Sequence, residues 1–537
     1  GNPLFAVQLI GDWVERGILR PGRRGFQLRD SAEVVVPDDL YAVWRERIDE
    51  LVRMRPDSDR LALEIAAILG QVVIPEEWLG ACRARGLRPS EGLLDTLLSR
   101  RLASAEEGGA WSFAHSMLRE SLHRSAVEAG RAAGHHRACA AMLQASGQAV
   151  GERLARHLVR AGALGTALEP TVRAIQAAIR AGDFNRADAL RALWEEAMEG
   201  LELHEGDPRW VPGLVASAEV HRFKDRPKQV RHICHRLEHG AERHGWPRSL
   251  RALAHLHRGR IARLNGNFQE AASLFHNGLQ LLADPSMAAP LHTNLGETLV
   301  QLGAFEGAEA ELRKAQRHAE RLRNRIELGD AWLGLAGVAL ARGELDQARA
   351  TTARARDAFR QAGHRWGLAE ATERFGDIAR HRRSWDEALH HYRLAVGMWH
   401  NLGTESAALT SDVHIALVDV ERGNAAAMGS HLDQLAARAR GFGHRGVWAT
   451  VRLAQVVCDA NVGAKKEWDQ HLAEATKAVR ETAFVSPDIA AMAELAGREA
   501  MARGWTERAT EAFELSLQQW KRLFREDDAD RVRWALP

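Results

Sequence analysis

The chain contains Gly266-Asn-Phe-Gln-Glu-Ala271, and the same pattern returns as Gly303-Ala-Phe-Glu-Gly-Ala308, Gly343-Glu-Leu-Asp-Gln-Ala348 and Arg383-Ser-Trp-Asp-Glu-Ala388. Weaker copies begin at Gly423, Gly463 and Gly504, and upstream copies begin at Gly182 and, in degenerate form, at Lys224. From Gly266 onward the copies are 37, 40, 40, 40, 40 and 41 residues apart, and the upstream spacings are both 42. This regularity indicates an internal structural repeat with a period of about 40 residues.

Each copy has the composition of a tight turn between two helices. Glycine can leave a helix through a left-handed conformation, and the alanine five positions later lets the second helix approach closely. Small residues stand seven positions before several of the turns (Gly259, Gly296, Gly376 and Gly497), and aromatic residues stand nine positions after several of them (Phe275, Tyr392 and Phe513). The pattern predicts about nine helical hairpins, stacked into a solenoid over residues 148–537.

The overall composition agrees with an all-α protein. Of the 537 residues, 45% are apolar and 27% are charged, and only two are tyrosine. Lys and Arg (73) nearly balance Asp and Glu (71), so the net charge of +2 gives no basic field that would favour nucleic acid. The four cysteines (Cys82, Cys139, Cys234 and Cys458) have no paired spacing, which favours a reducing compartment over a disulfide framework.

The chain has no apolar run of about 18 residues and no secretory leader pattern, so we expect a cytoplasmic protein without a membrane segment. It begins Gly-Asn-Pro without an initiator methionine, which favours a segment of a longer polypeptide.

The first 147 residues do not follow the repeat. Residues near Gly17 and Gly25 predict a short hairpin, Pro37 is placed to open a helix, and Leu61 to Leu69 predict a second helix. Trp111-Ser-Phe113 follows a Glu-Glu-Gly-Gly turn, which predicts a two-stranded wing before a helix that begins near His115. We therefore expect a winged-helix-like domain at 36–147, preceded at 1–35 by the remnant of another domain.

Two family resemblances follow from these residues. Residues from about 150 to the end resemble tetratricopeptide repeats, which the two best copies show through Trp332, Leu335, Gly343, Ala348 and Ala355 and through Gly376, Trp385, Ala388, Tyr392 and Ala395. The period exceeds the about 34 residues usual for that family. Such arrays mostly bind proteins or peptides in a concave groove, so the resemblance implies a partner-binding scaffold.

The N-terminal third resembles the region after the nucleotide-binding core of STAND signalling ATPases, including forms joined to protein kinases. The resemblance rests on Gly1-Asn-Pro-Leu-Phe5, Ala66-Ala-Ile-Leu-Gly70 and Trp111-Ser-Phe-Ala-His115-Ser-Met-Leu-Arg-Glu120. It implies that Pro3 would lie against a nucleotide base and that His115 would approach the phosphates. The alternatives are an ordinary helix-start proline and an interior histidine that caps its helix or packs beside Phe113.

No catalytic residues are predicted for this segment. The chain lacks a Gly-x-x-x-x-Gly-Lys-Ser/Thr phosphate loop, and the dipeptide Gly-Lys does not occur, so we expect no ATP hydrolysis by this segment and no cofactor in it. The resemblance implies that ATP or ADP would bind only to an ATPase, including forms joined to a serine/threonine kinase, in a longer polypeptide. The pairs His135-His136 and His390-His391 would point to different helix faces, which disfavours metal binding.

The first helix of each hairpin is expected to line the groove with polar residues that packing does not use. These candidate partner-binding residues are Arg260, Arg263, Thr293, Glu297, Gln301, Glu373, Asp377 and Arg380. Their mixed charge would suit an extended peptide, although ordinary solvent exposure is the alternative for each. The leading hypothesis is a sensing module that holds a protein, peptide or small effector, and the alternatives are a DNA-binding transcriptional regulator and a scaffold subunit of a complex.

Overall fold

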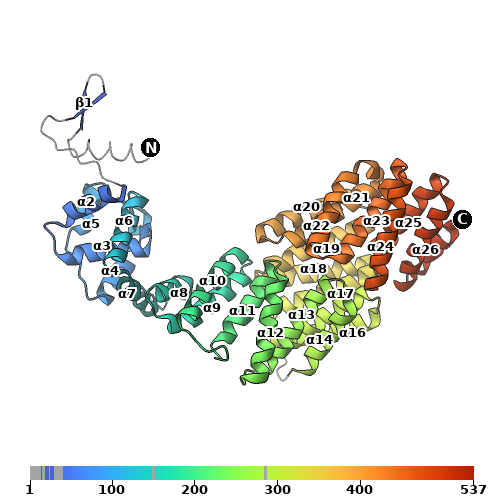
Figure 1. The fold of residues 1–537 in the computed structure, drawn as a ribbon, viewed down its shortest axis with the longest axis horizontal. Helices are drawn as coiled ribbons and strands as arrows, with labels where there is room; N and C mark the ends of the chain where they lie inside the picture. Colours follow the sequence, from blue (N-terminus) through green and yellow to red (C-terminus); the bar gives the residue numbers. More distant parts are fainter. Residues whose placement is uncertain (1–13, 15–18, 23–24, 29–39, 148–150, 283–286) are drawn as a thin grey trace. The chain divides into compact units, whose positions relative to one another are not determined.

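The computed structural model describes residues 14, 19–22, 25–28, 40–147, 151–282 and 287–537. Helix predominates throughout, as the composition predicts (Figure 1). The chain divides into two compact units, which we call unit 1 (1–174 and 192–203) and unit 2 (175–191 and 204–537). Within the described ranges, no helix has the length and apolar character needed to span a bilayer.

Unit 1 combines helices with short strands. Its elements are β1 Leu19–Gly22, β2 Gly25–Leu28, α2 Leu40–Val52, α3 Asp57–Leu69, β3 Val72–Val73, α4 Pro75–Ala84, α5 Leu93–Ser99, β4 Ala103–Ala105, β5 Trp111–Phe113, α6 Ser116–Glu128, α7 Ala132–Ala145 and α8 Gly151–Arg160. Strands β1 and β2 form the predicted hairpin. Strands β4 and β5 pair as expected, and β3 adds a third antiparallel strand, which gives the order β3-β5-β4.

The core of unit 1 lies between these helices and the small sheet. Trp44, Leu63, Trp78, Trp111 and Phe113 are all buried. The Trp111 ring meets the Trp78 and Phe113 rings edge-on, with centroids 5.5 and 5.1 Å apart. Such tilted contacts are the favoured geometry for aromatic pairs, so these three large residues pack together in one core.

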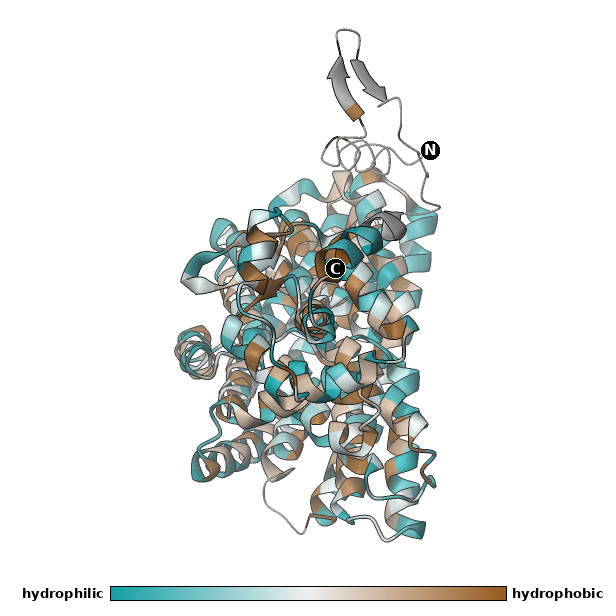
Figure 2. Ribbon diagram, turned by 90° about the vertical axis from the view of Figure 1, so that its left-hand side faces the viewer, coloured by the Kyte–Doolittle hydropathy of each residue, from teal (hydrophilic) through white to brown (hydrophobic). Residues whose placement is uncertain are grey.

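The remaining helices occur in consecutive pairs. They are α9 Leu164–Arg180, α10 Phe184–Gly200, α11 Trp210–Phe223, α12 Pro227–Arg243, α13 Ser249–Leu264, α14 Phe268–Gln280, α15 Ala288–Gln301, α16 Phe305–Leu322, α17 Arg325–Arg342, α18 Leu345–Ala362, α19 Arg365–His381, α20 Trp385–Leu402, α21 Glu405–Asp419, α22 Gly429–Phe442, α23 Arg445–Val462, α24 Lys465–Thr482, α25 Pro487–Ala502, α26 Thr506–Arg522 and α27 Glu526–Ala535. Apolar and polar residues alternate around many of these helices, as expected where one face is buried (Figure 2).

The chain reverses direction at the predicted turns. Gly266, Gly303 and Gly343 have φ values of 78°, 78° and 80°, and the next helix begins two residues after each of them. Arg383 takes the same left-handed conformation, with φ 59°, although it is not glycine. The turn predicted at Lys224 lies one residue later, because Asp225 is the residue with positive φ.

The predicted repeat is distorted at the turn that begins at Gly423. There the chain forms a wide turn at Val420–Asn424 and a 3-10 turn at Ala425–Ala427, and α22 begins only at Gly429. Three consecutive alanines replace the aromatic or leucine and its polar neighbours at this turn.

Close packing explains the small residues seven positions before the turns. A Cβ atom added to Gly376 would lie 2.6 Å from Cε1 of Tyr392, and one added to Gly259 would lie 2.4 Å from Cε1 of Phe275. Real Cβ atoms do not approach that closely, so the glycine in the first helix makes room for the aromatic ring of the second. The small and large positions read from the sequence therefore mark the contact between paired helices.

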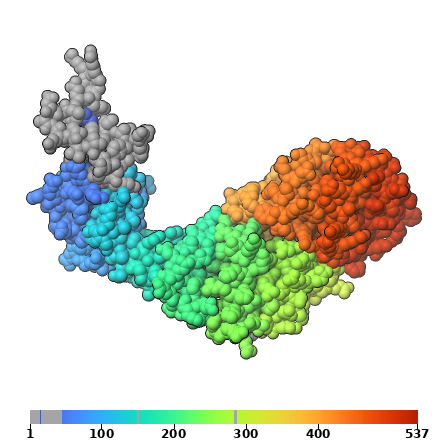
Figure 3. Space-filling view, viewed as in Figure 1, coloured from blue at the N-terminus to red at the C-terminus, as the bar shows by residue number. Residues whose placement is uncertain are grey.

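Unit 2 also makes contacts between hairpins that are far apart in sequence. The backbone N of Val485 donates to the carbonyl of Gln301 at 2.9 Å, and the rings of Phe268 and Phe484 stack with centroids 5.5 Å apart. Figure 3 shows later residues, in orange and red, lying directly against earlier ones, in green and yellow. One turn of the superhelix thus packs on the next after about 180–220 residues, as the contacts Asp225–Ser406 and Leu302–Arg522 show.

Candidate functional site

A cavity of about 400 Å³ lies inside unit 2, where the superhelix closes on itself. Its wall comes from the first helices of successive pairs, α13, α15, α17, α19, α21 and α23, and from residues 484–488 at the start of α25. Six of the eight residues predicted to bind a partner lie on this wall: Arg263, Glu297, Gln301, Glu373, Asp377 and Arg380. The geometry therefore brings together side chains from three of the predicted helices.

The other two predicted residues lie elsewhere. Thr293 is 4% exposed and belongs to the packed interior, so its hydroxyl is not offered to a ligand in the cavity. Arg260 lines a separate, smaller cavity of about 160 Å³, where its guanidinium is 3.4 Å from Glu219 and 3.3 Å from Asn294. Each of the two stands about one helical turn before a predicted residue that does line the cavity, Arg260 before Arg263 and Thr293 before Glu297.

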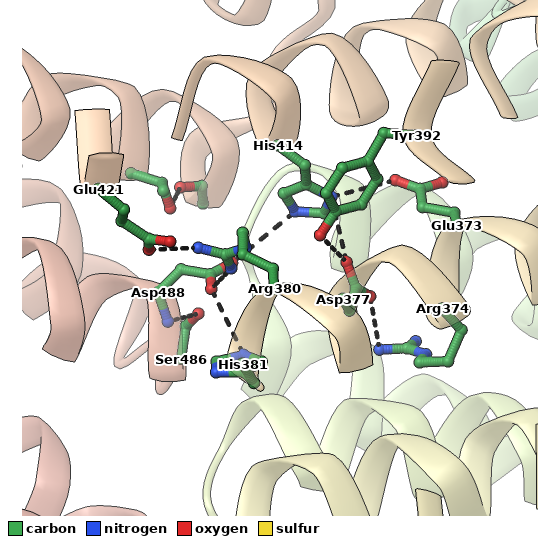
Figure 4. A network of polar contacts seen from close by, with 12 residues as sticks. Glu373, Arg374, Asp377, Arg380, His381, Tyr392, His414, Glu421, Ser486 and Asp488 are labelled. Atoms are coloured by element: carbon green, nitrogen blue, oxygen red, sulfur yellow. Dashed lines mark hydrogen bonds and ion pairs between the residues drawn. The ribbon is translucent and has the colours of Figure 1, made fainter. Parts of the chain in front are cut away.

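Arg380 is the centre of a polar network on one side of the cavity (Figure 4). It is 3% exposed, and its guanidinium donates to Glu421 at 2.7 Å and to Asp488. Burial alone would raise the pKa of Asp488, but Arg380, His414 and His381 together bring that pKa down to about 2. Ser486 caps helix α25 by accepting the backbone N–H of Asp488, so the carboxylate is also fixed at a helix N-terminus.

His414 connects this network to two further acids. Its Nδ1 lies 3.3 Å from Asp377 and 3.4 Å from Glu373, and its Nε2 lies 3.7 Å from Asp488. Burial by itself would lower the pKa of His414, yet the three carboxylates raise it above its ordinary value. The hydroxyl of Tyr392 donates a hydrogen bond to Asp377 at 3.0 Å. The imidazolium form of His414 is thus stabilised.

A different situation holds for the acids near the cavity that lie outside this network. Glu297 is paired with Arg263 at 2.9 Å, but within the described ranges neither Glu370 nor Asp330 forms an ion pair. Burial, reinforced by Glu297, raises the pKa of Glu370 to about 7. Burial and the nearby Glu370 and Glu297 also raise the pKa of Asp330, which lies on α17 beside the cavity wall. A positive ligand would relieve this repulsion.

The charged wall of the cavity has a surplus of acids. It carries three arginines (Arg263, Arg374 and Arg380) against five carboxylates (Glu297, Glu370, Glu373, Asp377 and Asp488). All three arginines are already bound to acids from the same wall. Gly337 of α17 has no side chain at the wall, and a Cβ there would have only Arg374 near it, at 3.9 Å, so a ligand can approach the helix backbone at this point.

Of the two residues predicted to contact a nucleotide, the structure describes only His115. Pro3 lies outside the described residues. His115 precedes α6 and is exposed, and its ring packs against Trp44 with centroids 5.1 Å apart. The alternative of an interior histidine is therefore wrong, and the side chain makes no capping hydrogen bond to α6.

Several site residues were missed by the sequence reading. Glu370 lies one helical turn before the predicted Glu373, on the same face as Asp377 and Arg380, so the helical period could have found it. His414 belongs to the next hairpin, whereas Asp488 comes from 108 residues after Arg380 and reaches the site only because the superhelix closes. That closure has no local sequence pattern.

No protein-family model and no curated protein sequence matches this chain. Among solved structures, it is similar to a Rap protein complexed with competence and sporulation factor, with 13% identity and a TM-score of 0.50, over 67% of this chain and 99% of that one. It is also similar to a signal transduction ATPase with numerous domains that has a tetratricopeptide repeat sensor, from Pyrococcus horikoshii, with 13% identity and a TM-score of 0.36, over 94% of this chain and 68% of that one. At 13% identity the likeness to the Rap protein concerns the fold alone, and it confirms the predicted tetratricopeptide-like helical solenoid.

Proposed function

We propose that unit 2 is a receptor for a peptide or protein segment that places a basic side chain in the cavity. The observation that carries this proposal is the pair Glu370, on the cavity wall, and Asp330, on the neighbouring helix α17. Both carboxylates are partly buried, each is repelled by Glu297, and neither has an ion pair in the described part of the chain. A lysine or arginine side chain between them would replace repulsion by charge-assisted hydrogen bonds. Buried acids without a partner cost stability, so their presence is typical of a binding site.

The rest of the cavity suits an extended chain. Arg380 and its acids form a fixed wall that does not need the ligand, since each group already has a partner. Gly337 of α17 leaves room for a ligand backbone, and Leu333 and Val413 offer apolar contact. A Rap protein of the same fold has been crystallised with competence and sporulation factor, which is a precedent for ligand capture by such a solenoid.

Unit 1 is proposed to pass the binding event on, as a winged-helix-like domain of a STAND signalling ATPase. The element order α3-β3-α4-α5-β4-β5, with the sheet order β3-β5-β4, supports the winged-helix assignment. The link to an ATPase, possible nucleotide contacts of Pro3 and His115, and a cytoplasmic location rest on the sequence alone. A phosphate-binding loop encoded upstream of Gly1 would support the link, and a coding region without one would remove it.

DNA binding is the less favoured alternative. In a winged helix, the third helix normally enters the major groove and needs basic side chains. Helix α5, Leu93–Ser99, holds this position and contains Asp95 but no lysine or arginine. A non-catalytic scaffold subunit is compatible with the same cavity and differs only in the size of the partner.

Binding of short capped peptides, measured by fluorescence anisotropy, tests the proposal. Pools that carry lysine or arginine at one fixed position should bind, and matched pools with norleucine or glutamate there should bind at least tenfold more weakly. The double variant Asp330→Asn, Glu370→Gln should lose this preference. Glu344→Gln, at the exposed turn after α17, is the matched control and should bind as the unaltered protein does. Equal binding of the lysine and norleucine pools would contradict the proposal.

A further inference from the structure

A second site lies far along unit 2 from the cavity, where the loop before α11 meets the end of α12. Glu205 belongs to that loop, His239 lies in the last turn of α12, and His244 follows the helix directly. One possible ligand atom from each of the three side chains lies within 4.8 Å of the other two. Glu205 and His239 are exposed and His244 is partly buried, so an ion from solvent can reach the group.

The loop that carries Glu205 is held in place on both sides. Trp246 donates its indole N–H to the carbonyl of Gly206 at 2.8 Å, and Trp210 donates to the carbonyl of His204 at 3.2 Å. The backbone N of Gly206 donates to Nδ1 of His204 at 3.0 Å. Three hydrogen bonds therefore fix the loop before any ion binds, which is the preorganisation that a metal site needs.

Gly206 also determines the position of His244. A Cβ atom at residue 206 would lie 2.7 Å from both Cγ and Nδ1 of His244, so the imidazole packs directly on the glycine backbone. His244 Nε2 is buried and has no hydrogen-bond partner in the described part of the chain. The His239 ring is 5.3 Å from the His244 ring, and the His204 ring is 5.7 Å from it, both measured between centroids.

We propose that Glu205, His239 and His244 form a binding site for a divalent transition-metal ion of the zinc class. Two imidazoles and one carboxylate are a ligand set that zinc takes in proteins, with a fourth position left for water or another side chain. Small side-chain rotations bring three atoms from within 4.8 Å to the separations that bonds of about 2.0–2.2 Å require.

The ion would connect the loop before α11 to the end of α12. Such a link constrains one hairpin of the array, and binding to the folded state alone raises its stability in proportion to metal concentration. The site is separate from the acidic cavity, so it does not depend on the peptide proposal. Oxygen-preferring ions such as Mg²⁺ should bind poorly, because imidazole nitrogen is not their preferred ligand.

Calorimetric titration of the full chain with Zn²⁺ tests the site, after removal of any purification tag and dialysis against a chelator. We expect one equivalent of Zn²⁺ to bind, and Mg²⁺ not to compete. His239→Ala and Glu205→Gln should each weaken binding on the order of 100-fold or more, because each loses a ligand, and Gly206→Ala should weaken it roughly 10–100-fold by displacing His244. His431→Ala, an exposed histidine on α22, should bind Zn²⁺ as the unaltered protein does.

Thermal melting separates loss of the site from loss of the fold. Because His239 is exposed, His239→Ala should melt at the same temperature as the unaltered protein in chelator. Added Zn²⁺ should raise the melting temperature of the unaltered protein and of His431→Ala, and leave that of His239→Ala unchanged. Absence of a Zn²⁺ equivalent in the unaltered protein, or the same affinity in His239→Ala, would overturn the proposal.

Discussion

Glu64 in unit 1 and Glu370 in unit 2 are both carboxylates shielded from bulk water, but only Glu64 is paired with cationic side chains. Glu64 is fully buried and accepts from Arg131 at 2.6 and 2.9 Å and contacts Nε2 of His135 at 2.9 Å. Burial alone would raise the pKa of Glu64, yet these partners lower it below its ordinary value. Glu370 has no such cation, and burial raises its pKa to about 7. The fold itself supplies cations to the first acid, whereas the second has no paired cation in the described part of the chain, and the proposed ligand would supply one.

We expect the largest loss of stability in unit 2 from removal of Arg380, because its guanidinium is buried between Asp488 and Glu421. Arg380→Ala leaves two acids without their cation, and we expect the free energy of local unfolding of α19–α21 to fall by about 4 kcal/mol. Hydrogen exchange of the backbone amides in these helices measures this change. Arg382→Ala is the control, since Arg382 pairs with the fully exposed Asp346 and its loss should change little. Equal effects of the two variants would contradict the account.

Glu64→Ala tests the corresponding pair in unit 1. It leaves His135 buried without its partner, while Arg131 keeps about a third of its side chain in solvent, so we expect a loss of about 3 kcal/mol. Chemical denaturation, followed through hydrogen exchange in α3 and α7, reports the loss. Glu120→Ala removes an acid that is about half exposed and should cost little. A loss below about 1 kcal/mol in Glu64→Ala would mean that this buried pair contributes little to stability.

The sequence predicts the hairpins better than the site, for a physical reason. Turns and small residues are local features, so Gly303, Gly343 and Ala348 could be read from spacing alone, as could the face that carries Glu373, Asp377 and Arg380. The partners of Arg380, in contrast, come from residues 41 and 108 positions later. Whether these partners lie close to Arg380 depends on the pitch of the superhelix, which is determined by many small packing contacts together.

A smaller loss of stability is expected at the contact between paired helices. Gly376→Ala places a Cβ 2.6 Å from the buried ring of Tyr392, so we expect a loss of about 2 kcal/mol from overpacking. Gly337→Ala is the matched change on α17, where the nearest atom is 3.9 Å away, at Arg374. There alanine should be neutral or stabilise the helix by up to about 1 kcal/mol. Denaturant unfolding of both variants decides whether close approach, and not the presence of glycine itself, is what the repeat requires.

The two acids should also differ in their effect on pH dependence. The pKa of Glu370 is raised in the folded state, so this group lowers stability as pH rises from about 4.5 to about 7. Glu370→Gln should therefore gain about 1 kcal/mol relative to the unaltered protein between about pH 5 and pH 8. The pKa of Glu64 is lowered, so its contribution is present at neutral pH and is lost on acidification below about 4.5. Denaturation of both variants across this range would reveal opposite slopes, and parallel slopes would contradict the comparison.

Proton release on ligand binding tests the central claim most directly. A basic side chain that pairs with Glu370 and Asp330 must lower their raised pKa values, so bound protons leave at about pH 6.5. Calorimetry with a lysine-containing peptide from the binding pools, in two buffers of different ionisation enthalpy, counts these protons. We expect net release from the unaltered protein and much less from Asp330→Asn, Glu370→Gln. Tight binding of the peptide without any dependence on buffer would show that these acids are not where its charge is held.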